Sequence, residues 1–393
     1  MNMREELLMI PGPVPVLPRI REAMSKPMIF HRGEEFGQLY AEIVEGLKEI
    51  FQTRNDLFVL SGSGTCAMEA AVENLAAEGT RVVCVANGKF GERFSEIAAG
   101  GGGGKRKREA NFDWGSPIEL EVVKAALEES PSSAPKVVTL VHNETSTGIL
   151  NPAREVGRLA RKHDAVFVLD CVTSIGGDEV LVDEFGVDIA IVGSQKCLGA
   201  PPGLSAVSVS EKAWDLIQEN KEEKEKEKKN KKRPYYADLV AYKKSFEKRQ
   251  TPYTPALPLF FALHEALEVV KEEGLTRRVE RHRRLAETVR NAVRGLGLEL
   301  FPRLNEVSSY SNTVTAVKIP EGKGLVDGDE QIRGGMLERG VRVAGGQGRL
   351  KGKIFRIATM GNITEDEVSR ITEDEISRTI EALEQVVEEV EKW

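Results

Sequence analysis

A lysine and an aspartate follow two short apolar runs of the 393-residue sequence, at the point where each run ends. Ala165 to Leu169 leads into Asp170, and Ile189 to Val192 leads through Gly-Ser-Gln into Lys196. Both runs are β-branched and too short for helices, so each is predicted to be a buried parallel strand. The carboxyl ends of parallel strands meet at one edge of a sheet, where open α/β folds bind ligands. An amine and a carboxylate are therefore expected to face one crevice.

Chemistry on pyridoxal phosphate (PLP) needs both of these groups. A lysine holds the cofactor's aldehyde as a Schiff base, and a carboxylate keeps the pyridine nitrogen protonated so that the ring withdraws electrons. Taken alone, the two residues favour ordinary interpretations. An aspartate that ends a strand is more often a helix N-cap or a magnesium ligand, and a lysine there is more often a solvated loop residue.

A glycine-rich loop follows a third apolar run, Asp56 to Leu60. This loop, Ser61-Gly-Ser-Gly-Thr65, leads directly into a helical pattern. Glycines let the backbone approach an anion, and a helix N-terminus adds about half a positive charge. Because no Gly-Lys-Ser/Thr follows, it is not a Walker loop. We expect Ser63, Gly64 and Thr65 to bind a phosphate group.

Nine stretches of the sequence resemble, in the same order, the motifs of class V aminotransferases of PLP fold type I. The likeness is to alanine:glyoxylate and serine:pyruvate aminotransferases and, most of all, to archaeal relatives that use aspartate or phosphoserine. One short motif can match by chance, whereas nine in order identify the chain as a member of the family. The stretches cover nearly the whole chain: Leu8 to Pro13, Ser61 to Thr65, Asn87 to Arg93, His142 to Gly148, Asp170, Gly193 to Lys196, Ala200 to Gly203, Thr251 to Pro255 and Gly352 to Arg356.

The resemblance implies a role for each candidate around the cofactor. Lys196 and Asp170 are the implied catalytic residues, and Phe90 is expected to stack on the pyridine ring. Without the resemblance, Phe90 is a core aromatic residue at a helix start, and Thr145 belongs to an ordinary polar loop. The implied cofactor-binding residues are Ser63, Gly64, Thr65, Phe90, Thr145, Asp170, Ser174, Gln195, Lys196, Thr251 and Thr254.

The resemblance also implies substrate contacts. Arg356 corresponds to the arginine that clamps the α-carboxylate, although a strand arginine is otherwise an exposed residue. Gly12 lies in the Pro-Gly-Pro loop near the site. His31 and Arg32 resemble a pair that lies by the substrate's phosphate in phosphoserine aminotransferases, and the alternative is a surface turn. After Arg356, Ala358-Thr-Met-Gly361 departs from the Gly-His-Met-Gly of near relatives.

The reaction implied is double-displacement transamination. The amino donor is expected to be a small or acidic L-amino acid (serine, alanine or aspartate), and the acceptor a 2-oxo acid (glyoxylate, pyruvate or 2-oxoglutarate). Phosphoserine aminotransferase activity stays open. A lyase or cysteine desulfurase shares the fold, but these typically stack a histidine and use a later cysteine, and no cysteine follows Cys197. A PLP-binding transcriptional regulator needs a helix-turn-helix domain that no segment supplies.

Strand and helix patterns alternate from Leu57 to Val192, which predicts an α/β fold with a mostly parallel sheet sandwiched by helices. Beyond Gly274, a basic helix at Thr276 to Leu296 and two strand patterns suit a smaller α+β domain. We expect an N-terminal arm at residues 1–20, a large PLP-binding domain at 21–273 and a small C-terminal domain at 274–393. In the family this arm crosses to the partner subunit.

The loop Thr251-Pro-Tyr-Thr-Pro255 has two prolines in five residues, so it is not regular structure. Family members use this loop to complete the partner's phosphate site, which implies a homodimer with active sites at the subunit interface. The alternative is that this loop is only a rigid turn between the two domains.

The composition argues against nucleic-acid and membrane partners and favours a cytoplasmic location. A net charge of -7 and a pI near 5.6 argue against nucleic acid. No run approaches the roughly 18 apolar residues of a membrane span, and the N-terminus lacks a signal-peptide pattern. Four cysteines without metal-like spacing are typical of a cytoplasmic protein with no metal site.

Three stretches depart from the family pattern. The default interpretations are a mobile loop for Gly100 to Arg108 and a solvated helix extension for Lys221 to Arg233, with a nucleic-acid patch as the weaker alternative. A tandem repeat, Ile363 to Arg370 and Ile371 to Arg378, predicts two helix starts with threonine caps.

Overall fold

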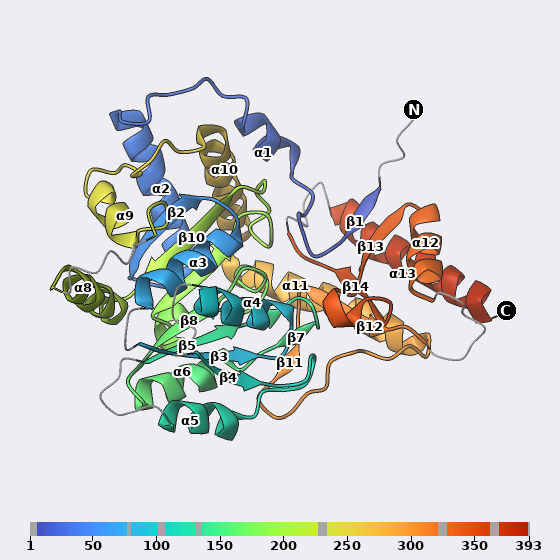
Figure 1. The fold of residues 1–393 in the computed structure, drawn as a ribbon. Helices are drawn as coiled ribbons and strands as arrows, with labels where there is room; N and C mark the ends of the chain where they lie inside the picture. Colours follow the sequence, from blue (N-terminus) through green and yellow to red (C-terminus); the bar gives the residue numbers. More distant parts are fainter. Residues whose placement is uncertain are drawn as a thin grey trace.

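The protein is described by a computed structural model over residues 6–76, 80–100, 107–129, 136–226, 234–320, 328–361 and 369–391. Within these residues a seven-stranded sheet and a four-stranded sheet lie side by side, and the long helix α11 runs between them (Figure 1). Along the same described ranges, no helix is long and apolar enough to cross a membrane.

The large sheet has the strand order β2-β10-β9-β8-β5-β3-β4. Every neighbouring pair is parallel except those that β10 makes with β2 and β9. This confirms the predicted, mostly parallel α/β architecture. Its strands are β2 (Asp56–Ser61), β3 (Arg81–Ala86), β4 (Lys107–Asn111), β5 (Lys136–Val141), β8 (Ala165–Asp170), β9 (Ile189–Gly193) and β10 (Leu204–Val209).

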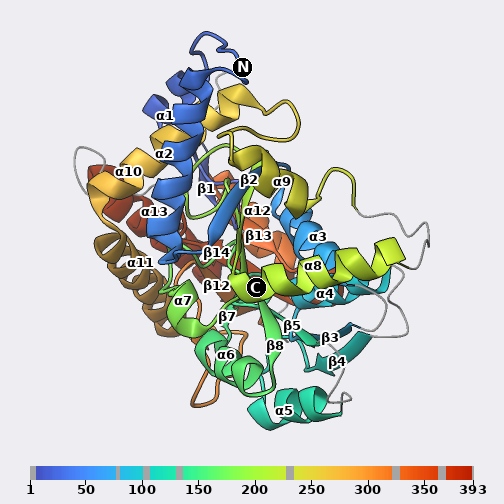
Figure 2. The same cartoon turned by 90° about the vertical axis from the view of Figure 1, so that its left-hand side faces the viewer.

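Helices cover both faces of this sheet, as Figure 2 shows. Successive side chains of a strand point to opposite faces, so Leu57 and Val59 of β2 join one apolar cluster while Phe58 and Leu60 join the other. The first cluster contains α1 (Pro18–Ala23), α2 (Glu34–Phe51), α5 (Leu120–Glu128), α6 (Ala153–Lys162), α7 (Val182–Phe185) and α10 (Leu257–Glu273), and the second contains α3 (Gly64–Leu75), α4 (Lys89–Ala98), α8 (Glu211–Lys226) and α9 (Leu239–Phe246).

The four-stranded sheet has the order β1-β13-β14-β12 and its own apolar cluster. A third, short sheet lies in the order β11-β7-β6. Because the two larger sheets have separate apolar clusters, we propose a large domain at residues 21–273 and a small domain at residues 274–393. The remaining elements are β1 (Leu7–Met9), β6 (Asn143–Glu144), β7 (Ile149–Leu150), α11 (Leu275–Gly295), β11 (Ser309–Tyr310), β12 (Val314–Lys318), α12 (Gly328–Glu338), β13 (Val341–Gly345), a 3-10 turn (Gly348–Leu350), β14 (Ile354–Ala358) and α13 (Ser369–Glu391).

The described part of the N-terminal arm pairs within its own chain, and a crossing of the arm to a partner subunit stays a prediction. Its strand β1 pairs in parallel with β13 of its own chain, Leu7 opposite Val341 and Met9 opposite Val343. Figure 1 shows β1 beside the C-terminal elements of the small sheet. The arm is therefore an edge strand of the second sheet, because Leu7 and Met9 bury their side chains in that sheet's cluster.

Three departures from the family pattern are partly described. Lys107 and Arg108, predicted to lie in a loop, belong to edge strand β4, where they pair with Val82 and Val83. The charged tract extends α8 as far as Lys226, which agrees with a helix extension, and residues 227–233 lie outside the described residues. Of the tandem repeat, residues 363–368 lie outside them too. The second copy lies within α13, so the prediction that a helix starts at Thr372 is wrong.

Candidate active site

A cavity of about 180 Å³ lies at the carboxyl edge of the large sheet. It collects side chains from the ends of β5, β8 and β9 and from the starts of α3 and α4. Among the predicted site residues, it brings together Ser63, Gly64, Thr65, Phe90, Thr145, Asp170, Gln195 and Lys196.

Lys196 lies in the turn after β9, and its amine donates a hydrogen bond to the carbonyl oxygen of Pro11. A Cβ placed on Gly12 would come 2.7 Å from Nζ of Lys196, and Gly12 has a φ of +80°, so only glycine suits this position. Burial lowers the pKa of Lys196 to about 8. A lysine with that pKa is partly neutral near pH 8, which suits a nucleophile and a proton acceptor.

Asp170 is the last residue of β8 and is buried. Its Oδ1 accepts a hydrogen bond from the backbone N–H of Val172 at 2.7 Å. Burial raises the pKa of Asp170 to about 7, while that hydrogen bond and the nearby positive charges of Arg93 and Lys196 act in the opposite direction. Burial therefore outweighs these positive charges in the free protein, and a cation placed closer would lower the pKa of Asp170.

The glycine loop meets the N-terminus of α3 as predicted. Ser63 is the N-cap residue, and its side chain makes no capping hydrogen bond, so its hydroxyl is left for another acceptor or donor. A Cβ on Gly64 would come 2.9 Å from Cγ2 of Val172, which shows how closely this backbone approaches the segment after Asp170.

Phe90 is held by a buried carboxylate from another part of the chain. Oε2 of Glu144 accepts hydrogen bonds from the backbone N–H groups of Phe90 and Gly91, each at 3.0 Å. Its Oε1 accepts from the backbone N–H and the hydroxyl of Ser146. Burial raises the pKa of Glu144, and these hydrogen bonds act against that rise. Glu144 therefore fixes the first turn of α4, and with it the position of the Phe90 ring.

Replacing Glu144 with leucine is expected to destabilise the protein by roughly 2 kcal/mol or more, because the backbone N–H groups of Phe90 and Gly91, one part-buried and one buried, lose their acceptor. The measurement is the midpoint of urea unfolding. Glu184, which is exposed and pairs with Arg154, provides the matched control. Its replacement is expected to cost less than about 1 kcal/mol. Equal losses in the two variants would contradict the role of Glu144.

Arg356 lies on β14, and its guanidinium reaches the rim of this site from the small sheet. Its Nη1 donates to the carbonyl oxygen of Thr145 at 3.0 Å, and Nε and Nη2 donate to that of Gly345 at 3.1 and 2.8 Å. Burial lowers the pKa of Arg356 to about 10, so the group stays charged near neutral pH. Thr145 is fixed in turn by a 2.7 Å hydrogen bond between its hydroxyl and that of Thr173.

Other predicted residues lie outside the cavity of this chain. Ser174 is buried one turn after Asp170, and its hydroxyl has no hydrogen-bond partner. Arg32 donates to the carbonyl oxygens of Thr251 and Pro252 at 2.6 and 3.3 Å, next to His31. Thr251 is buried in its own chain, whereas Thr254 is exposed.

Several lining residues were not among the predicted ones: Met68, Arg93, Val141, Asn143, Val172 and Thr173. Arg93 could have been predicted from the sequence, because it lies three positions after Phe90 and residues at that spacing share one face of a helix. Asn143 lies in the matched stretch His142 to Gly148, but no role was predicted for it. In the structure its amide donates to the hydroxyls of Thr173 and Thr313 at 3.0 and 2.7 Å.

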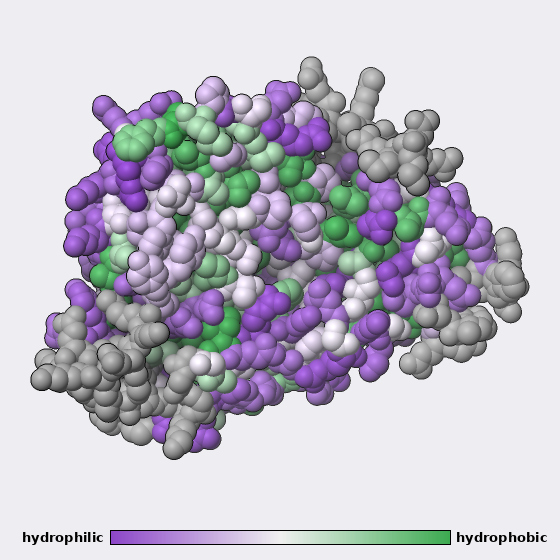
Figure 3. Space-filling view, turned by 45° about the horizontal axis from the view of Figure 1, so that its top comes forward, coloured by the Kyte–Doolittle hydropathy of each residue, from purple (hydrophilic) through white to green (hydrophobic). Residues whose placement is uncertain are grey.

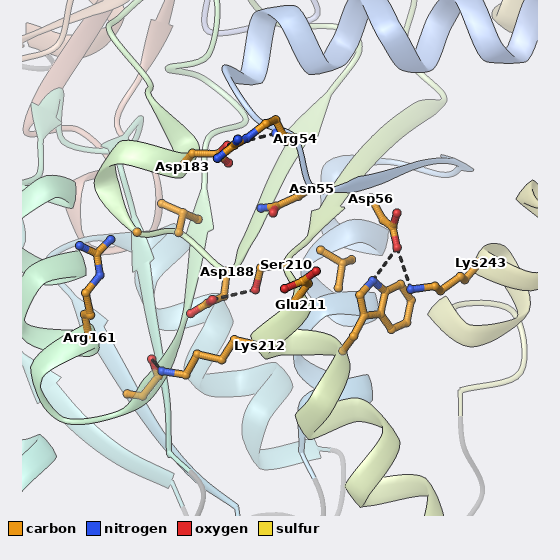
Figure 4. Close-up of a pocket in the computed structure, with 15 residues that line it drawn as sticks. Arg54, Asn55, Asp56, Arg161, Asp183, Asp188, Ser210, Glu211, Lys212 and Lys243 are labelled. Atoms are coloured by element: carbon orange, nitrogen blue, oxygen red, sulfur yellow. Dashed lines mark hydrogen bonds and ion pairs between the residues drawn. The ribbon is translucent and has the colours of Figure 1, made fainter.

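A larger pocket lies at the opposite, amino-terminal edge of the sheet strands (Figure 4). Several of its acidic and basic groups are paired with neighbours. Asp188 accepts from Ser210 at 2.7 Å, and Asp56 pairs with Lys243 at 2.8 Å. It holds neither the glycine loop nor Lys196 and Asp170, so the cavity at the carboxyl edge remains the candidate active site.

The cavity fits the expected cofactor. An amine and a buried carboxylate face it together with a glycine loop, and Oε1 of Gln195 on its wall is a buried acceptor without a hydrogen-bond partner. Pyridoxal phosphate presents an aldehyde, a basic ring nitrogen and a phosphate, which complement these groups in kind.

The comparisons with known proteins agree on one family. Residues 20–325 match the family described as aminotransferase class-V. An uncharacterized aminotransferase of Methanocaldococcus jannaschii is 45% identical over 93% of this chain and 90% of its own length. The crystal structure of an alanine–glyoxylate aminotransferase from a Nostoc species is 32% identical, with a TM-score of 0.84 over 98% of this chain and 96% of its own. That of a subgroup IV aspartate aminotransferase from Thermus thermophilus is 31% identical, with a TM-score of 0.82 over 98% of this chain and 100% of its own.

Proposed function

The chain belongs to the class V aminotransferases, and from this premise we propose that it moves an amino group from a small or acidic L-amino acid to a 2-oxo acid with bound pyridoxal phosphate. The donor is serine, alanine or aspartate, and the acceptor is glyoxylate, pyruvate or 2-oxoglutarate. One observation carries the proposal: Lys196 and Asp170, from two neighbouring strands, face the same cavity beside the glycine loop.

When bound, the cofactor supplies an aldehyde that condenses with amines and a protonated ring that withdraws electrons from the reacting carbon. Lys196 is the amine that holds the aldehyde, and once displaced by substrate, its neutral Nζ takes the proton from the substrate's Cα. Asp170 holds the proton on the ring nitrogen. Because burial raises the pKa of its carboxyl, a cationic nitrogen placed beside it would lower that pKa and stabilise the charged form.

The remaining residues position the reactants. Ser63, Gly64 and Thr65 bind the phosphate at the start of α3, with Gln195 on the same wall. Phe90 fixes the ring plane and Thr145 lies on the cavity wall, whereas Ser174, which lies outside the cavity, acts only through the turn after Asp170. Arg356 orients the substrate's α-carboxylate. Three of its five N–H donors are used by backbone carbonyls, so donors remain for a carboxylate. Gly12 lets the backbone approach Lys196 closely, and we propose that it lies beside the bound substrate.

We extend the proposal to a homodimer with active sites at the subunit interface. Large apolar side chains near the Thr251–Pro255 loop are exposed, with Phe30 at 69% and Tyr235 at 83%. Tyr236 stacks on Tyr253 of the loop at 5.1 Å between ring centroids. A partner that covers these rings would bring the exposed Thr254 toward its phosphate site. On the face seen in Figure 3, apolar patches lie between polar ones.

A cytoplasmic location stays a prediction. It is supported by the four cysteines, which are all unpaired thiols.

Half-reaction spectroscopy tests the function and names the donor. The holoenzyme is mixed separately with L-alanine, L-serine, L-aspartate, L-glutamate and L-phosphoserine, without acceptor, and the visible band of the bound cofactor is followed. We expect one subset of these to bleach the band within seconds, and a 2-oxo acid to restore it. Bleaching by L-phosphoserine alone would favour the phosphoserine alternative, in which His31 and Arg32 recognise the distal phosphate.

The D-enantiomers provide the matched control, because a D-amino acid whose carboxylate is held by Arg356 cannot turn its Cα proton toward Lys196. They are expected to leave the band unchanged. A band that no L-amino acid bleaches, or sulfide release from L-cysteine as the main reaction, would contradict an aminotransferase function and favour the desulfurase or lyase.

A further inference from the structure

Arg93 lies at the phosphate side of the active-site cavity. It is one of two basic residues among the described residues that line the cavity, and the other is Lys196. Nη1 of Arg93 donates a hydrogen bond to the Thr65 hydroxyl at 3.0 Å. The guanidinium carbon lies 4.7 Å from the centroid of the Phe90 ring. One side chain thus joins the glycine loop to the aromatic ring.

The two basic residues are not interchangeable. Under the proposed function, the amine of Lys196 is committed to the aldehyde end of the cofactor and to proton transfer. The phosphate carries nearly two negative charges, and an N-terminal helix turn offers only about half a positive charge. A guanidinium fork beside the glycine loop supplies both the charge and paired donors that a phosphate oxygen accepts.

The electrostatics of the cavity agree with this placement. Burial is the main cause of the raised pKa of Asp170 and of the lowered pKa of Lys196, and the positive charge of Arg93 acts on both groups. Arg93 is therefore close enough to influence each end of the proposed reaction centre, although it lies on α4 and they follow β8 and β9.

We propose that Arg93 binds the phosphate group of the cofactor, moving its Nη1 donor from Thr65 to a phosphate oxygen when the cofactor is present. This inference rests on the proposed function, since it assumes pyridoxal phosphate as the ligand. It adds a cationic phosphate contact, contributed by the chain's own α4, to the hydroxyl and backbone donors of the glycine loop.

The test compares two forms of the ligand that differ only in the phosphate. Purified full-length protein stripped of cofactor is titrated with pyridoxal phosphate and with pyridoxal, for wild type, R93Q and R93K. We expect R93Q to weaken pyridoxal phosphate by roughly 10- to 100-fold and to leave pyridoxal unchanged. R93K, which keeps the charge but lacks the fork, is expected to fall between them. Inorganic phosphate should raise the thermal midpoint of the stripped wild type and not that of R93Q.

Arg349 provides the matched control. Its guanidinium carbon lies 4.7 Å from the Trp114 ring centroid, the same distance as in the Arg93–Phe90 pair, and its side chain is 61% exposed. R349Q is expected to leave both affinities unchanged. If R93Q weakens pyridoxal and pyridoxal phosphate equally, Arg93 is only a tether between α4 and Thr65, and the inference is wrong. If instead the wild type binds no pyridoxal phosphate at all, the proposed function itself fails, so the two failures are distinguishable.

Discussion

Replacing Lys196 with alanine is expected to lower turnover by at least roughly 10²–10⁴-fold, the contribution of a positioned acid–base group alone. The variant loses both the amine that holds the aldehyde and the base that removes the Cα proton. Fold and cofactor pocket should persist, because the lysine side chain donates one hydrogen bond, to Pro11, and contributes no apolar packing to the clusters around the sheet.

Two measurements make this prediction specific. Borohydride treatment of wild-type holoenzyme should fix the cofactor to the peptide that contains residue 196, detected by mass, and should leave K196A unlabelled. An added small amine should restore part of the turnover of K196A by supplying a base. K212A is the matched control, because Lys212 lies at the opposite edge of the sheet. Labelling of another lysine in the wild type would sink the assignment.

The second large effect is expected for Asp170→Asn. Asparagine keeps the shape and can still accept from the Val172 N–H, but it carries no charge to hold a proton on the ring nitrogen. We expect turnover at saturating cofactor to fall by roughly 10²–10⁴-fold. Asp178 is an equally buried carboxylate outside the cavity, so D178N serves as the matched control. Comparable losses in both variants would mean that the effect comes from stability and not from cofactor chemistry.

The raised pKa of Asp170 also predicts that the stability of the cofactor-free protein depends on pH. The pKa of Asp170 is raised by burial from 3.8 to about 7, so folding takes up a proton between these values. The contribution of Asp170 to the free energy of unfolding therefore falls as pH rises through this window and is constant above it. Asparagine does not titrate. The stability of D170N relative to wild type is expected to rise from about pH 4 to about pH 7 and then level off, as measured by urea unfolding of cofactor-free protein. A difference that does not change with pH would contradict this.

Local patterns were sufficient to predict the residues that follow strands. Asp170 ends one short β-branched run and Lys196 follows another, and such runs, like the glycines before α3, depend directly on backbone geometry. Helical spacing likewise located α11 to within two residues at each end, because its apolar residues recur at that spacing over more than ten positions.

Contacts between segments that are distant in the sequence could not be predicted from local patterns. Glu144 accepts from residues that lie 54 and 53 positions earlier, and nothing near either segment signals the pairing. Strand β10 was not predicted because its short run follows two prolines and a glycine, which are typical of a loop. The pairing of β1 with β13 was not predicted either, since an edge strand of three residues carries no signal of the sheet that it joins.

The pairing of β1 with β13 has a consequence for the order in which the molecule is made. The first described strand lies against one of the last, Leu7 opposite Val341, and the residues that follow β1 cover Lys196. A nascent chain on the ribosome can complete the large sheet while β1 still lacks its neighbour. The cover over the lysine is thus a contact of very high sequence separation, which forms late and slowly. We therefore expect β1, which anchors this cover, to dock only after synthesis has passed β13, so an unfinished chain is expected to present the lysine without a fixed cover.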